Sequence, residues 1–231
     1  MCYKKLKAIY SITPFTQIDY PNHLACVVWF AGCNMRCLYC YNPEIVTGKG
    51  QYTENDLLDF LKSRQGLIEG VVLSGGECTL YPNIFNLCKD IKKLGFKIKL
   101  DTNGTNPRIL KKIVSYNLID FISLDFKAPK SKFYSITKSK VDYEKFRSSL
   151  EFITKQESVN YEVRTTVHSD LLNANDLNIM QKCLIELNYK KKYYIQNFRG
   201  DKQTLGSMTN QQRILDLNSI KNKEYFEFRN F

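Results

Sequence analysis

The sequence predicts an α/β protein in which a parallel sheet carries its helices on the outside. Six short apolar runs, each rich in strand-forming residues, alternate along the chain with amphipathic segments of helical spacing. Prolines and a glycine mark the ends of several of these segments, and polar residues follow the apolar runs. Six βα-type units in a row indicate either an open sheet or a partial barrel. The 231 residues suit one domain of the larger kind.

The first two βα units account for the chain up to residue 95. Residues 24–30 (LACVVWF) are predicted to form a strand, because a short apolar run rich in β-branched and aromatic residues is typical of a buried strand. A helix is predicted over 52–65, where Thr53 can cap the N-terminus and leucines recur on one face. The second strand is 71–77 (VVLSGGE). It leads to a helix over 81–95, with a proline in its first turn and a glycine at its end.

The remaining units repeat the alternation. Their predicted strands are 96–104 (FKIKLDTNG), 118–127 (LIDFISLDFK), 160–167 (NYEVRTTV) and 191–199 (KKYYIQNFR). Their predicted helices are 107–117, again opened by a proline, 141–157 and 175–188. From about Thr209 the tail is expected to contain one more helix-like stretch and then a strand at EYFEF.

Polar residues stand at the carboxyl end of every predicted strand. In parallel α/β folds these ends share one edge of the sheet, and the chemistry of the protein gathers there. We therefore expect one site at that edge. In chain order, its candidate residues are Cys33, Cys37 and Cys40, then 74–77, 101–104, Asp125 and Lys127, Arg164 and His168, and finally Gln196, Asn197 and Arg199.

The three cysteines of GCNMRCLYC indicate a metal centre. No apolar run is long enough to span a bilayer, and MCYKKLKAIYSITPF lacks a signal-peptide core, so we expect a cytoplasmic protein with reduced thiols. Thiolates suit iron–sulfur clusters and zinc, and a structural zinc needs a fourth ligand that is missing nearby. A 4Fe–4S cluster on Cys33, Cys37 and Cys40 would leave one iron open.

CNMRCLYC resembles the cysteine signature of the radical S-adenosylmethionine (SAM) enzymes, with Tyr39 as the aromatic residue before the last cysteine. The resemblance implies a partial (β/α)6 TIM-like barrel and a 4Fe–4S cluster whose open iron binds the methionine part of SAM. Reductive cleavage of SAM then gives a 5′-deoxyadenosyl radical. SGGE is similar to the family's GGE segment. There, Gly75 and Gly76 let backbone approach closely, and Glu77 helps to take the methionine ammonium.

A finer resemblance, from about Ile12 to Arg199, is to the glycyl-radical-enzyme activases. It is closest to the short anaerobic ribonucleotide reductase activating proteins, through YNPEIV, EVRTTV and YYIQNFR, while DTNG and LDFK resemble pyruvate formate-lyase activase. The resemblance implies SAM contacts, with room for a monovalent cation beside the two aspartates. The residues expected to make them are Asp101, Asn103, Asp125, Lys127, Arg164 and His168. Each of two residues keeps an alternative. Arg164 pairs with a protein carboxylate instead of the cofactor, and His168 is a solvated loop residue instead of a SAM contact.

The implied reaction is removal of a Cα hydrogen from a glycine of a large partner enzyme, which leaves a glycyl radical. The expected partners are an anaerobic ribonucleotide reductase large subunit and a flavodoxin- or ferredoxin-like electron donor. We expect one radical SAM domain over 1–231, with a core of about 20–200 and a C-terminal extension of about 201–231. The alternatives are activation of another glycyl radical enzyme, action on RNA or a small molecule, and a cluster-bearing electron carrier or zinc module without catalysis.

The net charge of +11 suggests either a footprint for nucleic acid or an acidic partner, or else simply a lysine-rich composition. No aromatic and basic motif of an RNA-binding module accompanies the lysines, so nucleic acid is not the expected partner.

Overall fold

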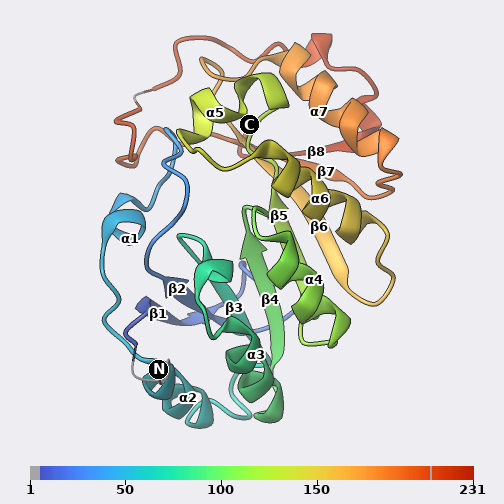
Figure 1. The fold of residues 1–231 in the computed structure, drawn as a ribbon. Helices are drawn as coiled ribbons and strands as arrows, with labels where there is room; N and C mark the ends of the chain where they lie inside the picture. Colours follow the sequence, from blue (N-terminus) through green and yellow to red (C-terminus); the bar gives the residue numbers. More distant parts are fainter. Residues whose placement is uncertain (1–5, 209) are drawn as a thin grey trace.

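One eight-stranded sheet organises the chain in the computed structural model, which describes residues 6–208 and 210–231 (Figure 1). Its strands are β1 (Ile9–Thr16), β2 (Ala25–Phe30), β3 (Gly70–Gly75), β4 (Lys97–Thr102), β5 (Phe121–Asp125), β6 (Asn160–Val167), β7 (Tyr193–Asn197) and β8 (Phe226–Arg229). They lie side by side in chain order. β1 is antiparallel to β2, and every later pair is parallel.

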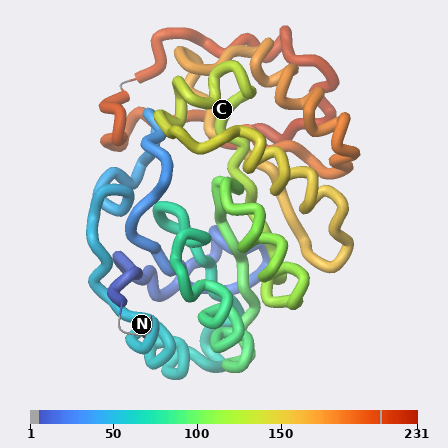
Figure 2. Tube along the Cα trace, viewed as in Figure 1, coloured from blue at the N-terminus to red at the C-terminus, as the bar shows by residue number. Residues whose placement is uncertain are grey.

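The sheet is curved and carries its helices on the convex side, which confirms the predicted partial barrel (Figures 1 and 2). The helices are α1 (Pro43–Thr47), α2 (Glu54–Lys62), α3 (Ile84–Lys93), α4 (Pro107–Ser115), α5 (Lys130–Thr137), α6 (Tyr143–Thr154) and α7 (Ala174–Glu186). Among the described strands, β1 and β8 are the two ends of the sheet and do not pair with each other. No helix of the described chain has the length and apolar character needed to cross a membrane.

Local sequence signals explain where the predicted helices begin. α2 starts after Thr53, whose hydroxyl accepts from the Asp56 N–H while the Asp56 carboxylate accepts from the Thr53 N–H, a reciprocal capping box. Pro107 stands at the first turn of α4, as predicted. The prediction for Pro82 was wrong, because α3 begins only at Ile84 and a short 3₁₀ turn, Cys78–Leu80, precedes it.

Four other elements differ from the predictions made from residue patterns. The pattern did not reveal β1, although the family resemblance implied a first strand, and α1 and α5 were missed because they are short. The helix-like stretch of the tail was also wrong. Thr209 lies outside the described residues, and from residue 210 the chain forms only two 3₁₀ turns, Leu217–Ser219 and Lys223–Tyr225, before β8. The strand at EYFEF is confirmed as β8.

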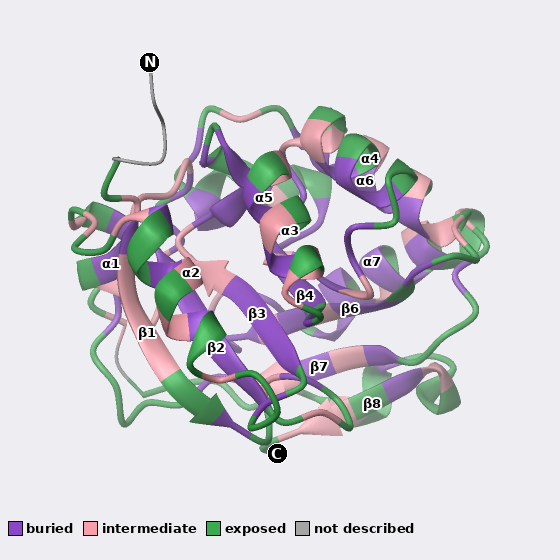
Figure 3. Cartoon of the chain, turned by 90° about the horizontal axis from the view of Figure 1, so that it is seen from below, coloured by how far each residue is buried: buried purple, intermediate pink, exposed green. Residues whose placement is uncertain are grey.

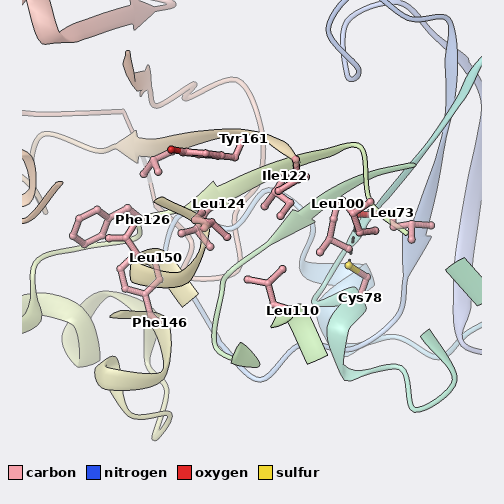
Figure 4. Packing of buried hydrophobic residues seen from close by; sticks show 14 of the residues in the cluster. Leu73, Cys78, Leu100, Leu110, Ile122, Leu124, Phe126, Phe146, Leu150 and Tyr161 are labelled. Atoms are coloured by element: carbon pink, nitrogen blue, oxygen red, sulfur yellow. Dashed lines mark hydrogen bonds between the residues drawn. The ribbon is translucent and has the colours of Figure 1, made fainter. Parts of the chain in front are cut away.

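The two faces of the strands pack differently because successive side chains point to opposite sides. On the convex face, Leu73, Leu100 and Leu124 pack under the helices in the main core (Figure 4). On the concave face, Val27 and Val72 belong to a small second cluster. Figure 3 shows the strands mostly buried and the outer sides of the helices exposed. Towards the carboxyl ends of the strands, the concave face becomes polar, and the candidate site lies there.

Candidate functional site

A cavity of about 290 Å³ opens at the carboxyl end of the concave face. Most of the predicted site residues line it; the exceptions are Gly104, His168, Asn197 and Arg199. The full lining is Asp19, Trp29, Cys33, Met35, Cys37, residues 39–42, Val46, residues 74–77, residues 101–103, Asp125, Lys127, Arg164, Thr166 and Gln196. Residues from strand ends far apart in sequence therefore meet at one cavity. Strand order explains it, since β2 to β7 are consecutive parallel neighbours.

The cysteine segment forms a loop that a second segment holds in place. The backbone N–H of Arg36 donates to the Thr137 carbonyl at 2.8 Å, and that of Leu38 donates to the Ile136 carbonyl at 3.1 Å. Met35 and Tyr39 bury their side chains beneath the loop, at 1% and 3% exposure. The loop therefore has a fixed shape, with Cys33, Cys37 and Cys40 all on the cavity wall.

Two thiols of this loop, those of Cys33 and Cys37, are weaker acids than an ordinary cysteine. Burial raises the pKa of the Cys33 thiol to about 12 and that of Cys37 to about 11. Thiols ligate metals as thiolates, so a bound cationic centre has to supply the charge that keeps them deprotonated. Lys127 lowers the pKa of both thiols, but burial outweighs it.

Glycine is required at position 75, the last residue of β3, and at position 76, which follows it. A Cβ on Gly76 would lie 1.9 Å from the Gly32 carbonyl oxygen, and one on Gly75 would lie 2.3 Å from the Phe30 nitrogen. Gly75 also adopts φ +114°, which L side chains rarely reach. The close approach brings the 74–77 backbone against the start of the cysteine loop, where the Gly76 N–H donates to the Phe30 carbonyl at 2.9 Å.

Glu77 is 2% exposed and ties the ends of β3 and β4 together. Its Oε1 accepts from the Thr79 N–H (3.1 Å), the Thr79 hydroxyl (2.5 Å) and the Thr102 hydroxyl (2.8 Å), and its Oε2 accepts from the Asn103 N–H (2.7 Å). Burial raises the pKa of this carboxyl, and the four donors oppose that rise. The carboxylate is thus a structural bridge, with its Oε2 as the less occupied oxygen.

Asn103 links the end of β4 to the cysteine loop. Its Nδ2 donates to the Asn34 Oδ1 at 2.9 Å and lies 3.9 Å from the Cys33 sulfur. The Asn34 Nδ2 in turn donates to the Thr105 hydroxyl at 2.8 Å, and that hydroxyl donates back to Asn103 Oδ1 at 2.6 Å. Asn34 and Thr105 were not predicted, because nothing in their local sequence distinguishes them from turn residues.

A charged cluster forms the wall opposite the cysteine loop. Arg164 on β6 places its Nε 2.6 Å from Asp125 Oδ1 and its Nη2 3.3 Å from Asp101 Oδ2. Lys127 lies 2.9 Å from Asp125 Oδ2, and Lys99 pairs with Asp101. Arg164 therefore places a positive charge beside both aspartates, in the region where the family resemblance leaves room for a monovalent cation.

These ion pairs keep the cluster charged. Burial would raise the pKa of Asp125, but Arg164 and Lys127 more than offset it and hold that pKa well below its usual range. The pKa of Asp101 is lowered in the same way, by Arg164 and Lys99 against the effect of burial. For Lys127, burial favours the neutral amine, yet Asp125 raises the pKa well above its usual value.

His168 lies apart from the cavity. Its side chain is 1% exposed, and its ring packs 4.6 Å from the ring of Phe198, centroid to centroid. The Nδ1 faces the Asp170 N–H at 3.3 Å. The residue is therefore neither solvated nor directed at the cavity. Cys78 is also turned away, with its sulfur 3.4 Å from the Asp101 carbonyl oxygen.

Several cavity residues were not assigned to the site from the sequence. Trp29 lines the cavity and donates from its indole N–H to the Thr13 hydroxyl at 2.9 Å. Thr166 also lines it. The two-residue period of a strand was the available signal, because Thr166 shares a face with Arg164. Asp19 lines the cavity as well, beside Gln196, which was already a strand-end candidate.

The residues present fit a cluster and a zwitterionic cofactor better than a single ion. Among the described residues, no three Cys, His, Asp or Glu side chains are arranged around one metal-ion position. Three thiols on one wall nevertheless provide the donor set of an iron–sulfur cluster, in which each thiolate binds its own iron. The glycine-shaped backbone at 75–76 and the charged wall leave space for a ligand that carries both charges.

Comparison with known proteins agrees with this geometry. The radical SAM superfamily sequence model matches residues 27–169. A Methanocaldococcus jannaschii protein named as a glycyl-radical enzyme activating enzyme is 31% identical over 203 residues, which are 84% of this chain and 81% of the relative. The pyruvate formate-lyase-activating enzyme of Clostridium pasteurianum is 32% identical over 126 residues, 52% of each chain.

Solved structures support the fold. The chain resembles anSMEcpe with bound AdoMet at a TM-score of 0.59 and 22% identity, covering 73% of this chain and 49% of that one. It resembles Streptococcus suis SuiB bound to S-adenosylmethionine at 0.61 and 14%, covering 80% of this chain and 44% of that one. The chain thus spans less than half the length of both structures, and at these identities the likeness concerns the fold alone.

Proposed function

Because this chain belongs to the radical SAM superfamily and is a glycyl-radical-enzyme activating enzyme with a 4Fe–4S cluster and SAM as cofactors, we propose that its partner is an anaerobic ribonucleotide reductase. We also propose that the cavity described above is the cofactor site. The observation that carries the site assignment is that three thiols, a glycine-shaped backbone and a charged wall from β4 to β6 meet in one cavity.

Cys33, Cys37 and Cys40 are proposed to hold the cluster, with Tyr39 buried beneath it. A cluster held there and reduced by one electron would supply, with bound SAM, a 5′-deoxyadenosyl radical and methionine for removal of a hydrogen atom from the glycine Cα of the partner. The remaining residues bind and orient. In the proposed arrangement, backbone carbonyls around Gly75 and Gly76 face the methionine ammonium.

Lys127 is the proposed partner of the methionine carboxylate. A lysine ammonium has three donors, and Asp125 uses one of them at 2.9 Å. The raised pKa of Lys127 keeps the group charged throughout the neutral range. Asp101 and Asp125, both kept ionised by Arg164, are proposed to face the ribose side of the cofactor. His168 is left out of the proposed site because it does not line the cavity.

The choice of ribonucleotide reductase rests on the sequence likeness of YNPEIV, EVRTTV and YYIQNFR to the short activating proteins of that enzyme. The match to a pyruvate formate-lyase-activating enzyme over 126 residues favours a second candidate, activation of a formate-lyase-type partner. We further propose that a flavodoxin- or ferredoxin-like protein supplies the electron, and that the enzyme acts in the cytoplasm.

The test is electron paramagnetic resonance on anaerobically reconstituted, dithionite-reduced protein. The samples contain SAM and either an anaerobic ribonucleotide reductase or a pyruvate formate-lyase, and Cys37→Ala serves as the control. A glycyl-radical doublet with the reductase, together with 5′-deoxyadenosine, is the expected result. A doublet only with the lyase would transfer the proposal to the second candidate. Deoxyadenosine without any doublet would reject both partners.

A further inference from the structure

The cysteine loop is held from a second side by the chain segment that follows β7. We call residues 198–208 the strap. Its N–H groups at Leu205 and Gly206 donate to the carbonyls of Cys40 and Leu38, both at 2.9 Å. These contacts join residues more than 160 positions apart in the sequence. In Figures 1 and 2 the strap runs alongside the loop at the upper left of the molecule.

A third contact secures the other end of the strap. The Arg199 N–H donates to the Tyr41 hydroxyl at 2.6 Å, and the Tyr41 ring stacks on the Phe198 ring with centroids 5.5 Å apart and planes 16° apart. Tyr41 lines the cavity. The strap therefore contacts Leu38, Cys40 and Tyr41, the part of the loop that carries the last cysteine.

The strap has a defined shape of its own. Thr204 is 2% exposed, and its hydroxyl accepts from the Met208 N–H at 2.7 Å. The Ser207 N–H donates to the Thr204 carbonyl at 3.0 Å. These two bonds close a tight turn around Leu205 and Gly206, which presents their N–H groups to the loop.

Gly206 is the residue that allows this close contact. A Cβ at position 206 would lie 2.7 Å from both the Cα and the carbonyl oxygen of Leu38, which are backbone atoms that cannot rotate away. Glycine is therefore required at position 206 because there is no space for a Cβ. Gly200, in the same strap, differs, because its Cβ would meet the side-chain oxygen of Asn210, which can turn aside.

The segment 136–137 and the strap bind different backbone groups of the cysteine loop. Thr137 and Ile136 bind the N–H groups of Arg36 and Leu38, whereas the strap binds the carbonyls of Leu38 and Cys40. We propose that Gly206 is a positioning residue, which seats the strap on the cysteine loop and so holds Cys40 in place for the cluster. This inference rests on the proposed assignment of Cys33, Cys37 and Cys40 as the cluster ligands.

The test compares Gly206→Ala with Gly200→Ala, the same substitution in the same segment. Amide hydrogen exchange is measured on the full chain before and after cluster reconstitution. In Gly206→Ala, the amides of Leu205 and Gly206 should exchange about tenfold faster than in the wild type, because losing two hydrogen bonds opens the contact. In Gly200→Ala they should exchange at the wild-type rate. Iron release to a chelator should be faster only in Gly206→Ala.

Equal exchange in Gly206→Ala and the wild type would overturn the proposal. If Gly206→Ala does not fold, Tyr41→Phe provides the second probe, because it keeps the ring stack and removes only the hydroxyl that accepts from Arg199. Exchange of the Arg199 amide should be about threefold to tenfold faster in this variant, which is the effect of losing one hydrogen bond. An unchanged exchange rate of that amide would also contradict the proposed contact between the strap and the loop. If the wild type binds no cluster, the proposed function fails. Amide exchange in the cluster-free chain still tests whether the strap holds the cysteine loop.

Discussion

Replacing Arg164 with methionine tests whether the charged wall is an electrostatic unit. The Arg164 guanidinium lies 2.6 Å from Asp125, 3.3 Å from Asp101 and 4.0 Å from Glu162. Lys99, Lys127 and Arg229 are the other cations of the cluster and pair with Asp101, Asp125 and Glu162. Methionine removes the charged hydrogen bond to Asp125 Oδ1 and the cation shared by the two aspartates in a largely buried cluster. Breaking a buried ion pair in this way costs about 3–5 kcal/mol of unfolding free energy.

The pH dependence of the loss has a definite sign. The folded-state pKa values of Asp101 and Asp125 lie below the usual value of about 3.9. Groups of this kind contribute stability that is complete above the unfolded pKa and is lost as the pH falls through the folded pKa. The deficit of Arg164→Met should therefore be full at pH 7 and should shrink as the pH falls below about 4.

Urea unfolding of the cluster-free protein provides the assay. The fluorescence of Trp29, the single tryptophan and a cavity residue, is followed at several pH values. Arg199→Met is the matched control, since the Arg199–Asp201 pair is exposed, and exposed pairs contribute only about 0–1 kcal/mol. An Arg164→Met protein as stable as the Arg199→Met protein at pH 7, or a deficit that grows in acid, would refute the reasoning.

Three further predictions concern individual cavity residues. Cys37→Ala should lose the iron of the reconstituted protein while its circular dichroism stays that of the wild type; complete unfolding would contradict a cluster held on a loop. Lys127→Ala should weaken SAM binding by about tenfold to a hundredfold, as expected for a lost charged hydrogen bond, with iron content unchanged, and equal affinity in equilibrium dialysis would remove Lys127 from the site. Glu77→Gln should lower the unfolding free energy by about 1.5–3 kcal/mol, because the amide NH₂ cannot accept from the donors around Glu77. Denaturation midpoints equal to those of the wild type would show that the bridge is dispensable.

The sequence alone predicted the features that depend on neighbouring residues. The cysteine spacing, the GG pair before Glu77 and the strand pattern of NYEVRTTV are local, and local chemistry limits what they can form. Parallel pairing of most strands also followed, because strands that alternate with helices favour a parallel sheet with the helices outside. Short elements such as α5 carry too few residues for a periodic signal.

The tertiary structure alone decided which distant groups meet. Residue patterns put Arg164 on a strand, but only the pairing of β5 with β6 brings it to Asp125, and its side chain also reaches Asp101 on β4, the neighbour of β5. His168 follows the same strand and yet turns under Phe198. The contact of Gly206 with Leu38 joins the tail to the cysteine loop, and no local sequence signal could reveal it. In each case the outcome depends on how strands and loops that are distant in sequence pack together, and no local pattern of residues contains that information.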